Sequence, residues 1–415
     1  MALDKRQRFI TILILGLLSA LGPFSIDMYL PGFPVIARSL HTSIEYVGYS
    51  LSSFFIGISV GQLIYGPLLD RFGRKRPLYV GMVIYILASI GCAFASSIEV
   101  LIVLRLFQAL GGCVGMVAPR AMVRDSFPVD ENAKIFSLLV LILGVSPVLA
   151  PTAGSFVISA FGWNAVFIVL AVVALLTLLI VIFWLPESKQ PDPGFSLRPK
   201  AIAGSFWFVM KEPQFYTNAL GGGISAAGLF AYLAGSPFIF MELYHTSEQV
   251  YGFIFALIAI GLITSSQMNT LLLRRYSSEQ ILHVVLVLQT TMGVLLVAGT
   301  VTDVLGLYGT IALIFLFLCC QGFNFPNSSA LSMAPFTREA GSASALMGAL
   351  QMLLGSLASA AVGMLANGTA IPMTAVMAGC ATAGLLILMI GNRRFHYKAR
   401  SRDIEAQAFD MIEKY

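Results

Sequence analysis

The sequence predicts an all-α membrane protein with twelve transmembrane helices, arranged as two six-helix bundles related by a pseudo-twofold axis. Of its 415 residues, 58% are hydrophobic and only 11% are charged, and the mean hydropathy is +0.86. This composition excludes a water-soluble globular chain. Apolar runs of about 20 residues, the length that a spanning helix needs, recur along the whole chain. A polar break near the middle separates six of these runs from six others.

The apolar runs give the predicted spans in order. They cover residues 9–34, 44–69, 77–97, 98–120, 134–160, 163–185, 214–240, 248–273, 280–301, 305–330, 340–367 and 371–391. Residues 186–213 are rich in charge and proline, which predicts a cytoplasmic linker. We therefore expect one bundle over residues 1–185, a second over 214–391, and a cytoplasmic tail over 392–415.

The distribution of lysine and arginine predicts the orientation. With a cytoplasmic N-terminus, only Arg38 of the 25 basic residues falls in an outer loop and only Arg105 falls inside a span. The remaining 23 lie on the cytoplasmic side or at its edge, so we expect both termini in the cytoplasm. The first apolar run is long and lacks a signal-peptide cleavage site, so it is interpreted as the first span. The net charge of +5 is then a topology signal, and we expect no nucleic-acid partner.

The two halves of the chain are related by an internal repeat. A shift of 204 residues carries one segment onto another, and the matched pairs are His41 and His245, Thr42 and Thr246, Ser43 and Ser247, Gly48 and Gly252, Gly57 and Gly261, Leu68 and Leu272, Leu69 and Leu273, and Arg71 and Arg275. A register held over this length predicts parallel six-span repeats, with a substrate site between the halves. The same shift puts Ala231 where Asp27 stands, so the chemistry is expected in the first half.

Asp27 is the carboxylate of the first span. An ionisable side chain inside a membrane costs at least about 2.5 to 3.5 kcal/mol on insertion scales, so it usually faces a cavity or a partner. We interpret Asp27 as a proton or substrate site. The alternative is that Pro31 and Pro34 end the helix near the outer surface, where Asp27 is simply hydrated.

The segment between the second and third spans, GPLLDRFGRKRP over residues 66–77, is typical of a tight basic turn. On its residue types alone it could be only a topology anchor. It resembles the signature of the major facilitator superfamily at this position, which implies a gating cluster of charges. The resemblance assigns gating to Asp70, Arg71 and Arg74, with Arg124 and the start of the eleventh span near Gly341 as candidate partners.

Arg105 lies inside the fourth span, in the stretch RLFQALGG over residues 105–112. A buried arginine keeps its proton and must find acceptors or water. The stretch resembles the family's proton-coupling motif, although Ala109 stands where that motif usually has glycine. The resemblance implies that Arg105 tunes Asp27 or orders water near it. The alternative is a structural role on backbone carbonyls.

The fifth span carries Gly144, Pro147, Pro151 and Gly154 at spacings of three or four, which places them on one helical face. Such a stripe permits close backbone approach and bending, and its spacing alone is also typical of ordinary helix packing. It resembles the antiporter motif of drug-exporting facilitators, which implies a gating role and favours export.

Four stretches together resemble the Bcr/CflA group, the bicyclomycin and chloramphenicol-florfenicol exporters. They are IDMYLPGFP around Asp27, RLFQALGG, APRAMVRD over residues 118–125, and SPVLAPTAGS in the fifth span. The resemblance implies proton-coupled efflux of small drug-like molecules across a bacterial inner membrane by alternating access. It implies protons and a drug-like molecule as partners in the lipid bilayer, and no cofactor beyond the proton gradient. The fold needs only one chain, so we expect a monomer.

Polar and aromatic side chains in several spans are candidates for the substrate cavity, because drug-like ligands favour aromatic walls with a few polar groups. The candidates are Tyr29, Tyr49, Phe54, Phe230, Tyr232, Gln321, Asn324 and Asn327. Each could instead serve packing or face lipid.

Two other classes of function were weighed. An uptake or export carrier for a metabolite, such as a sugar, peptide or amino acid, uses the same architecture, and the fifth-span stripe argues against uptake. A membrane enzyme or receptor finds no support, because the four histidines are scattered and no metal spacing, nucleotide-binding loop or nucleophile motif occurs. The five cysteines lie in apolar runs, where they usually pack.

Overall fold

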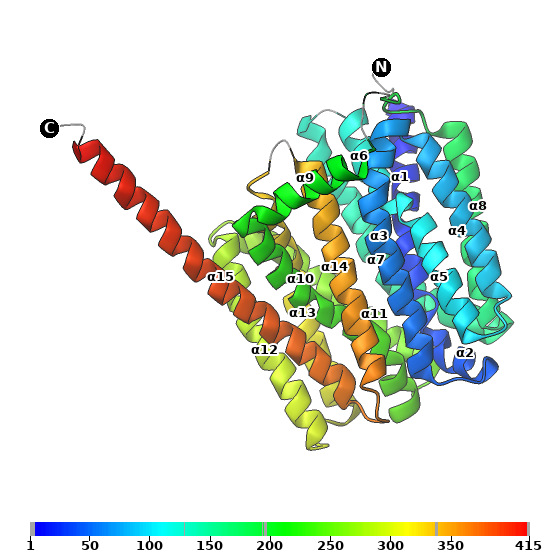
Figure 1. Cartoon of the computed structure of the whole chain (residues 1–415). Helices are drawn as coiled ribbons and strands as arrows, with labels where there is room; N and C mark the ends of the chain where they lie inside the picture. Colours follow the sequence, from blue (N-terminus) through cyan, green and yellow to red (C-terminus); the bar gives the residue numbers. More distant parts are fainter. Residues whose placement is uncertain (1–4, 128, 193, 195–196, 337–338, 413–415) are drawn as a thin grey trace.

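The computed structural model describes residues 5–127, 129–192, 194, 197–336 and 339–412. Within these residues the chain contains helices and no strand, and twelve helices are long and apolar enough to cross a membrane. The predicted all-α fold with twelve spans is confirmed. Figure 1 shows the helices of the first and second halves as two groups that stand side by side.

The helices of the first half match the predicted spans within a few residues. They are α1 (Lys5–Asp27), the short 3-10 helix η1 (Leu30–Gly32), α2 (Phe33–Ser39), α3 (Ile44–Phe72), α4 (Lys75–Ala93), α5 (Ile98–Gly112), α6 (Val114–Ser126), α7 (Val129–Phe161) and α8 (Trp163–Trp184). Two predicted spans are each built from more than one helix. The first is α1 with η1 and α2, and the fourth is α5 with α6.

The second half follows the same plan. Its helices are α10 (Pro213–Pro237), the π-helical turn η2 (Phe238–Leu243), α11 (Glu248–Leu272), α12 (Ser278–Val301), α13 (Gly306–Met333), α14 (Ala340–Met364) and α15 (Ile371–Ile412). The predicted linker contains a helix that the sequence analysis missed, α9 (Pro199–Lys211), which crosses one end of the bundle in Figure 1. The predicted tail begins as a continuation of α15.

The internal repeat is visible in the backbone. His41 and His245 both adopt left-handed backbone conformations, with φ of 51° and 53°. Two residues later Ser43 and Ser247 each cap a helix N-terminus, accepting a hydrogen bond from the third residue beyond. The same turn therefore opens α3 in the first half and α11 in the second.

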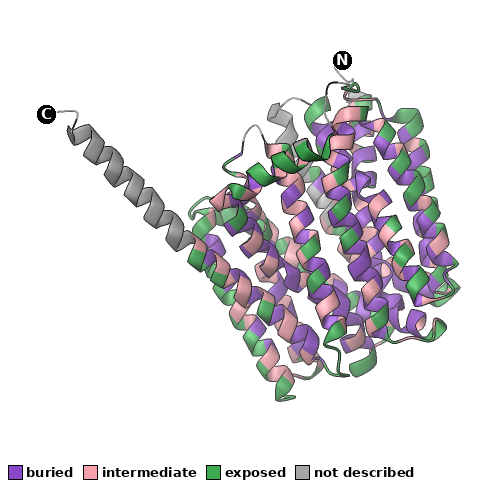
Figure 2. Ribbon diagram, in the orientation of Figure 1, coloured by how far each residue is buried: buried purple, intermediate pink, exposed green. Residues whose placement is uncertain are grey.

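The core lies between the helices, and the outer surface is apolar. Figure 2 shows buried residues concentrated on the faces where helices meet. Small residues allow close contact there: a Cβ added to Gly57 would lie 2.6 Å from the Leu106 carbonyl oxygen. Large apolar side chains on the outside, such as Phe183 and Leu176 of α8, are exposed, as expected for a lipid-facing surface.

The two halves meet mainly through two helix pairs, α3 with α14 and α7 with α11. Serine hydroxyls connect the first pair. Ser59 Oγ donates to the Ala349 carbonyl at 2.8 Å, and Ser356 Oγ donates to the Ser52 carbonyl at 2.9 Å. We call the end of the bundle that carries residues 73–76 and α9 the linker end, and the end that carries α2 the far end.

Candidate functional site

The first spanning segment is broken directly after Asp27. Helix α1 ends at this residue, η1 follows from Leu30, and α2 begins at Phe33. Pro31 and Pro34 lack the backbone N–H groups that a continuous helix would use. The break lies at the boundary between the halves, because η1 contacts α7 on one side and α10 and α11 on the other.

The Asp27 side chain is buried, with 5% of its surface exposed. No described residue donates a hydrogen bond to its carboxylate or forms an ion pair with it. Its electrostatic neighbours are the hydroxyls of Tyr232 and Tyr251, both from the second half. Tyr251 is itself held by a 3.0 Å hydrogen bond with Ser236. The helix therefore ends near Asp27, as the hydrated alternative supposed, but the side chain is enclosed between the halves rather than exposed at a surface.

The fifth-span stripe packs against this break. A Cβ added to Gly154 would overlap the Met28 carbonyl, so only glycine allows α7 to lie this close. Towards the second half, the backbone of Pro151 lies 3.7 Å from where a Cβ on Gly252 would be. Gly144 faces Ile263 of α11 at ordinary contact distance. Pro147 lies within α7 between these contacts. The stripe thus contacts both the Asp27 break and the opposing half.

Arg105 lies in a separate, fully buried cluster inside the first half. Its guanidinium carbon is 4.1 Å from the ring centre of Phe54, 4.6 Å from that of Tyr29 and 5.8 Å from that of Phe167. Such a desolvated cation over aromatic faces gains about 2 kcal/mol or more. Tyr29 and Phe54, predicted as substrate residues, therefore form part of the enclosure of Arg105.

Polar contacts complete this cluster. Arg105 Nη1 donates to Gln108 Oε1 at 2.7 Å, and Gln108 Nε2 donates to Ser89 Oγ at 2.8 Å. The Tyr29 hydroxyl hydrogen-bonds with Ser50. The Nε and Nη2 groups of Arg105 have no hydrogen-bond partner in the described chain. These two N–H groups are the buried donors that a water or a moving carboxylate could use.

The structure does not bring Arg105 and Asp27 together as an ion pair. Ser25, two residues before Asp27, hydrogen-bonds with the Tyr85 hydroxyl of α4 at 2.6 Å, whereas Asp27 lies beside the second half. Two residues along a helix are separated by about 200°, so Ser25 and Asp27 point to opposite sides. Tyr29, which lies in the break between α1 and η1, connects the two regions because its ring contacts Arg105 directly.

A charge cluster occupies the linker end. Arg74 Nε donates to Asp125 at 2.7 Å, and Arg74 Nη1 donates to Asp70 at 3.1 Å. Lys189 of the linker also binds Asp70, at 2.8 Å. Glu187 accepts the backbone N–H of Arg74 at 2.9 Å. The linker residues thereby attach to the turn between α3 and α4.

Two of the predicted gating residues, Asp70 and Arg74, bind each other directly in this cluster. Burial alone would lower the pKa of Arg74, but its bonds to Asp125 and Asp70 raise that pKa above its ordinary value. Arg71 donates to the Asp192 carbonyl at 3.2 Å. Arg124 is outside the cluster and faces a cavity instead. Three members of the cluster, Asp125, Glu187 and Lys189, were missed in the sequence analysis. Their charge was the only sequence signal that could have indicated them.

A cavity of about 670 Å³ opens between the halves at the linker end. Its walls come from α3, α6, α9 and the start of α14, and the charged residues that line it are Asp70, Arg74, Arg120, Arg124 and Glu339. Gly341, predicted near the gate, also lines it. The volume suits a small organic molecule.

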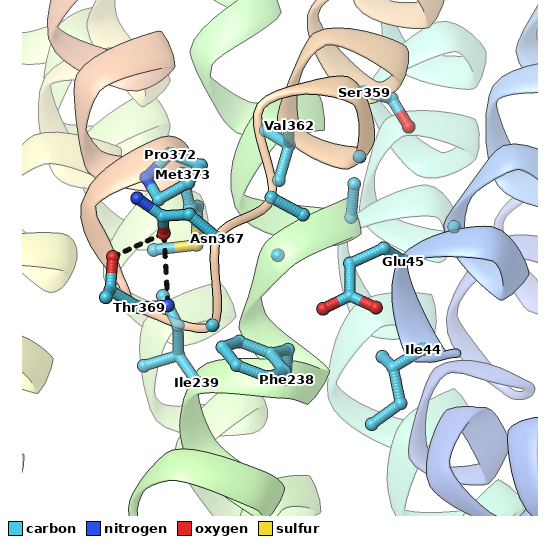
Figure 3. A pocket seen from close by; sticks show the side chains of 16 residues that line it. Ile44, Glu45, Phe238, Ile239, Ser359, Val362, Asn367, Thr369, Pro372 and Met373 are labelled. Carbon is cyan, nitrogen blue, oxygen red and sulfur yellow. Dashed lines mark hydrogen bonds between the residues drawn. The ribbon is translucent and has the colours of Figure 1, made fainter.

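The far end of the bundle, unlike the linker end, is closed. Figure 3 shows Ser359, Val362, Phe238 and Ile44 around a pocket there whose free volume is about 30 Å³, room for little more than a water molecule. Ser52 Oγ donates to Ser359 Oγ at 2.8 Å beside it. The structure is therefore open at the linker end and shut at the far end.

The other predicted substrate residues lie in packed positions rather than along the large cavity. Phe230 packs edge-on against Phe55, with ring centres 4.6 Å apart, and Tyr49 packs beside Gly363. Gln321 accepts a hydrogen bond from Asn324, and Asn327 donates to Asn269 at 2.7 Å. Tyr232 is the member of this set beside Asp27, and its hydroxyl has no hydrogen-bond partner in the described residues. Their substrate role stays a prediction.

The profile of the Major Facilitator Superfamily matches residues 15–360. The chain belongs to this superfamily. Members are membrane transporters, so this facilitator is a multi-pass membrane transporter and not an enzyme. Its charge cluster, buried arginine and glycine-proline stripe lie in the spans where the sequence resemblance placed them.

Curated relatives extend over nearly the whole facilitator. An uncharacterized MFS-type transporter, YdgK, of Bacillus subtilis is 34% identical over 388 residues, which are 92% of this chain and 95% of that protein. A bicyclomycin resistance protein homolog of Haemophilus influenzae is 29% identical over 92% of this chain and 96% of its own length. The multidrug resistance protein MdtL of Shigella flexneri is 28% identical over 89% of this chain and 92% of its own length. The predicted resemblance to the bicyclomycin-resistance branch is confirmed.

Solved structures share the fold. A D-xylose-proton symporter superimposes with a TM-score of 0.72 at 14% identity, covering 92% of this chain and 97% of that one. A second structure is that of a bacterial homolog of the human lysosomal transporter Spinster, in an inward-facing and unoccupied conformation. It superimposes with a TM-score of 0.70 at 15% identity, covering 94% of this chain and 96% of that one. At these identities the likeness concerns the fold alone.

Proposed function

We propose that this facilitator exports small drug-like molecules of the phenicol or bicyclomycin type from a bacterial cytoplasm, in exchange for protons. The halves rock about a central site, and the linker end faces the cytoplasm with both termini, in the inner membrane. The observation that carries the proposal is Asp27, a buried carboxylate between the halves with no ion-pair partner among the described residues. The names of two relatives, which concern bicyclomycin and multidrug resistance, support the choice of substrates.

In the proposed cycle, a drug molecule enters the cavity at the linker end while Asp27 is ionised. Opening of the far end lets a periplasmic proton reach the carboxylate as the Asp27 break separates from α10 and α11. Protonation favours release of the drug, and loss of the proton to the cytoplasm resets the carrier. Exchange of one proton for one neutral molecule moves charge, which contributes about 2.3 kcal/mol per 100 mV.

Arg105 is assigned an indirect role in this cycle. Its aromatic enclosure includes Tyr29, which lies in the break itself, two residues after Asp27. If the break moves between the two conformations, the Tyr29 ring moves with it. The N–H groups of Arg105 that find a hydrogen-bond acceptor would then differ between the conformations. Arg105 would thus respond to the position of the break rather than pair with Asp27 in the conformation described.

Drug accumulation in bacterial cells tests the direction of transport. Cells that express the facilitator should accumulate less chloramphenicol than control cells, and an uncoupler that collapses the proton gradient should abolish the difference. Higher accumulation with expression would indicate uptake. No difference for phenicols and bicyclomycin would favour a metabolite carrier on the same fold.

A further inference from the structure

Helix α6 presents two arginines to the cavity at the linker end. Arg120 and Arg124 are one helical turn apart, and with Val117 and Ala121 they form the cavity face of α6. Neither arginine has a hydrogen bond, ion pair or aromatic contact among the described residues. They therefore differ from Arg74 in the same cavity, whose guanidinium is taken up by Asp125 and Asp70.

The position of Arg120 is unusual for a residue that only anchors topology. It lies six residues before the end of α6, or about 9 Å of helix rise inside the linker end. Basic residues that anchor a span normally reach towards lipid headgroups or bulk water. Arg120 faces instead into the space between the two halves, opposite Gln62 and Gly66 of α3 and the start of α14.

The free charge in the cavity is positive. Asp70 is already bound to Arg74 and Lys189, so its negative charge is compensated. Glu339 at the start of α14 is the remaining acidic residue of the lining, against Arg120 and Arg124. A guanidinium binds a carboxylate or phosphate through two parallel N–H···O bonds, which makes arginine well suited to recognise planar or tetrahedral anions.

We infer that this cavity binds an anionic group, a carboxylate, sulfonate or phosphate, on the molecule that enters from the linker end, with Arg120 as the principal donor and Arg124 as the second. The inference rests on the proposed transport function insofar as the cavity is the entry chamber for a substrate. It extends the substrate class from neutral drugs to molecules that carry an acidic group, and it adds a recognition site distinct from Asp27.

The test uses phenylglyoxal, which modifies accessible arginines, with the protein in phosphatidylcholine nanodiscs and modification followed by peptide mass spectrometry. Benzoate and benzamide are matched probes of nearly the same shape that differ in charge. Benzoate should slow modification of Arg120 by at least about threefold, as expected for a charge-assisted pair, and benzamide should not. Arg76, outside the cavity lining, is the internal reference and should react equally in all samples.

Two variants and a lipid exchange separate the alternatives. Benzoate should still protect Arg124 in Arg120→Lys, which keeps the charge, and should protect it less in Arg120→Gln. Equal protection by both probes, or none by benzoate, would overturn the inference. If phosphatidylglycerol nanodiscs slow modification of Arg120 without benzoate, the site binds a lipid headgroup and the assignment to a transported molecule is wrong.

The same samples distinguish this inference from the proposed function. Transport of chloramphenicol and of its anionic succinate ester is measured in parallel. Benzoate protection without phenicol transport would retain the anion site and reject the proposed substrates. When both hold, Arg120→Gln should reduce transport of the succinate ester by a larger factor than transport of chloramphenicol, whereas an equal reduction of the two would overturn the anion site.

Discussion

Ser52 of α3 donates a hydrogen bond to Ser359 of α14, with 2.8 Å between the two hydroxyl oxygens. Both side chains are buried, and the two helices belong to different halves of the transporter. This contact lies beside the closed pocket at the far end. Because it joins the two halves at the closed end, it should contribute to the balance between the two conformations.

Replacing both serines, Ser52→Ala with Ser359→Ala, should favour opening of the far end. Loss of one buried hydrogen bond is worth about 1 kcal/mol, or roughly a fivefold shift in the population of the closed state. Spin labels at Tyr46 and Asn367, which lie at the far end of opposite halves, would report the distance distribution by electron paramagnetic resonance. Thr291→Ala, which removes an exposed hydrogen bond within α12, is the control. An unchanged distribution in the double variant would show that this contact does not influence opening.

The pair between Arg74 and Asp125 should stabilise the linker end. Arg74 is buried, so Asp125→Asn weakens one of the two interactions that compensate its charge. Asp125 itself is partly exposed, so the loss should be below the roughly 3 to 5 kcal/mol that breaking a fully buried pair costs. We expect a lower thermal unfolding midpoint in detergent and slower transport. Arg71→Gln, which removes a more exposed arginine of the same turn, should lower the midpoint less. A midpoint for Asp125→Asn equal to that of the wild type would contradict this role.

Gly154 and Gly144 provide a matched pair on α7. A methyl group at Gly154 overlaps the Met28 carbonyl, whereas one at Gly144 meets only the Ile263 side chain at ordinary contact distance. Gly154→Ala should therefore displace the Asp27 break and destabilise the protein by about 1 to 3 kcal/mol, with a marked loss of transport. Gly144→Ala should leave both properties close to those of the wild type. Similar transport by the two variants would mean that the close approach at Gly154 is not required.

Arg105 can be tested for a role beyond packing. Arg105→Met keeps much of the side-chain volume and removes a buried cation, and replacement of buried charges by apolar residues is often neutral for stability. The variant should fold, with a thermal midpoint near that of the wild type, and should lose proton-coupled transport. If Arg105→Met transports normally, the arginine serves packing alone.

The spans could be predicted closely because the membrane imposes length and hydropathy on each helix. The internal repeat was also detected in the sequence, and the structure adds that the matched residues His41 and Ser43, like His245 and Ser247, form the same turn before α3 and α11. Helix α9 was missed because the prolines and charges of residues 186–213, most of them outside the helix, indicated a loop. Its apolar residues Ile202, Phe206 and Val209 follow helical spacing, a signal too short to stand out.

The partners of the site residues could not be read from the chain. Asp27 meets Tyr232 and Tyr251 more than 200 positions away, and no local pattern encodes such a contact. Arg105 was expected near Asp27, because both are charged and lie in the same half. Arg105 is instead enclosed by Gln108 and aromatic rings. Asp27 faces the second half, on the side of α1 opposite to Ser25. Asp125 and Lys189 were visible as charges, but only the fold showed that Arg74 and Asp70 bind them.

Proton movement in inverted membrane vesicles tests the role of Asp27 most directly. Vesicles acidified inside receive chloramphenicol, and a fluorescent pH probe follows proton release. The wild type and Asp303→Asn, which removes an exposed carboxylate from the α12–α13 loop at the far end, should release protons when the drug is added. Asp27→Asn should give no release while remaining folded in the membrane. Drug-triggered proton release by Asp27→Asn equal to that of the wild type would contradict the assignment of Asp27 as the proton-coupling residue.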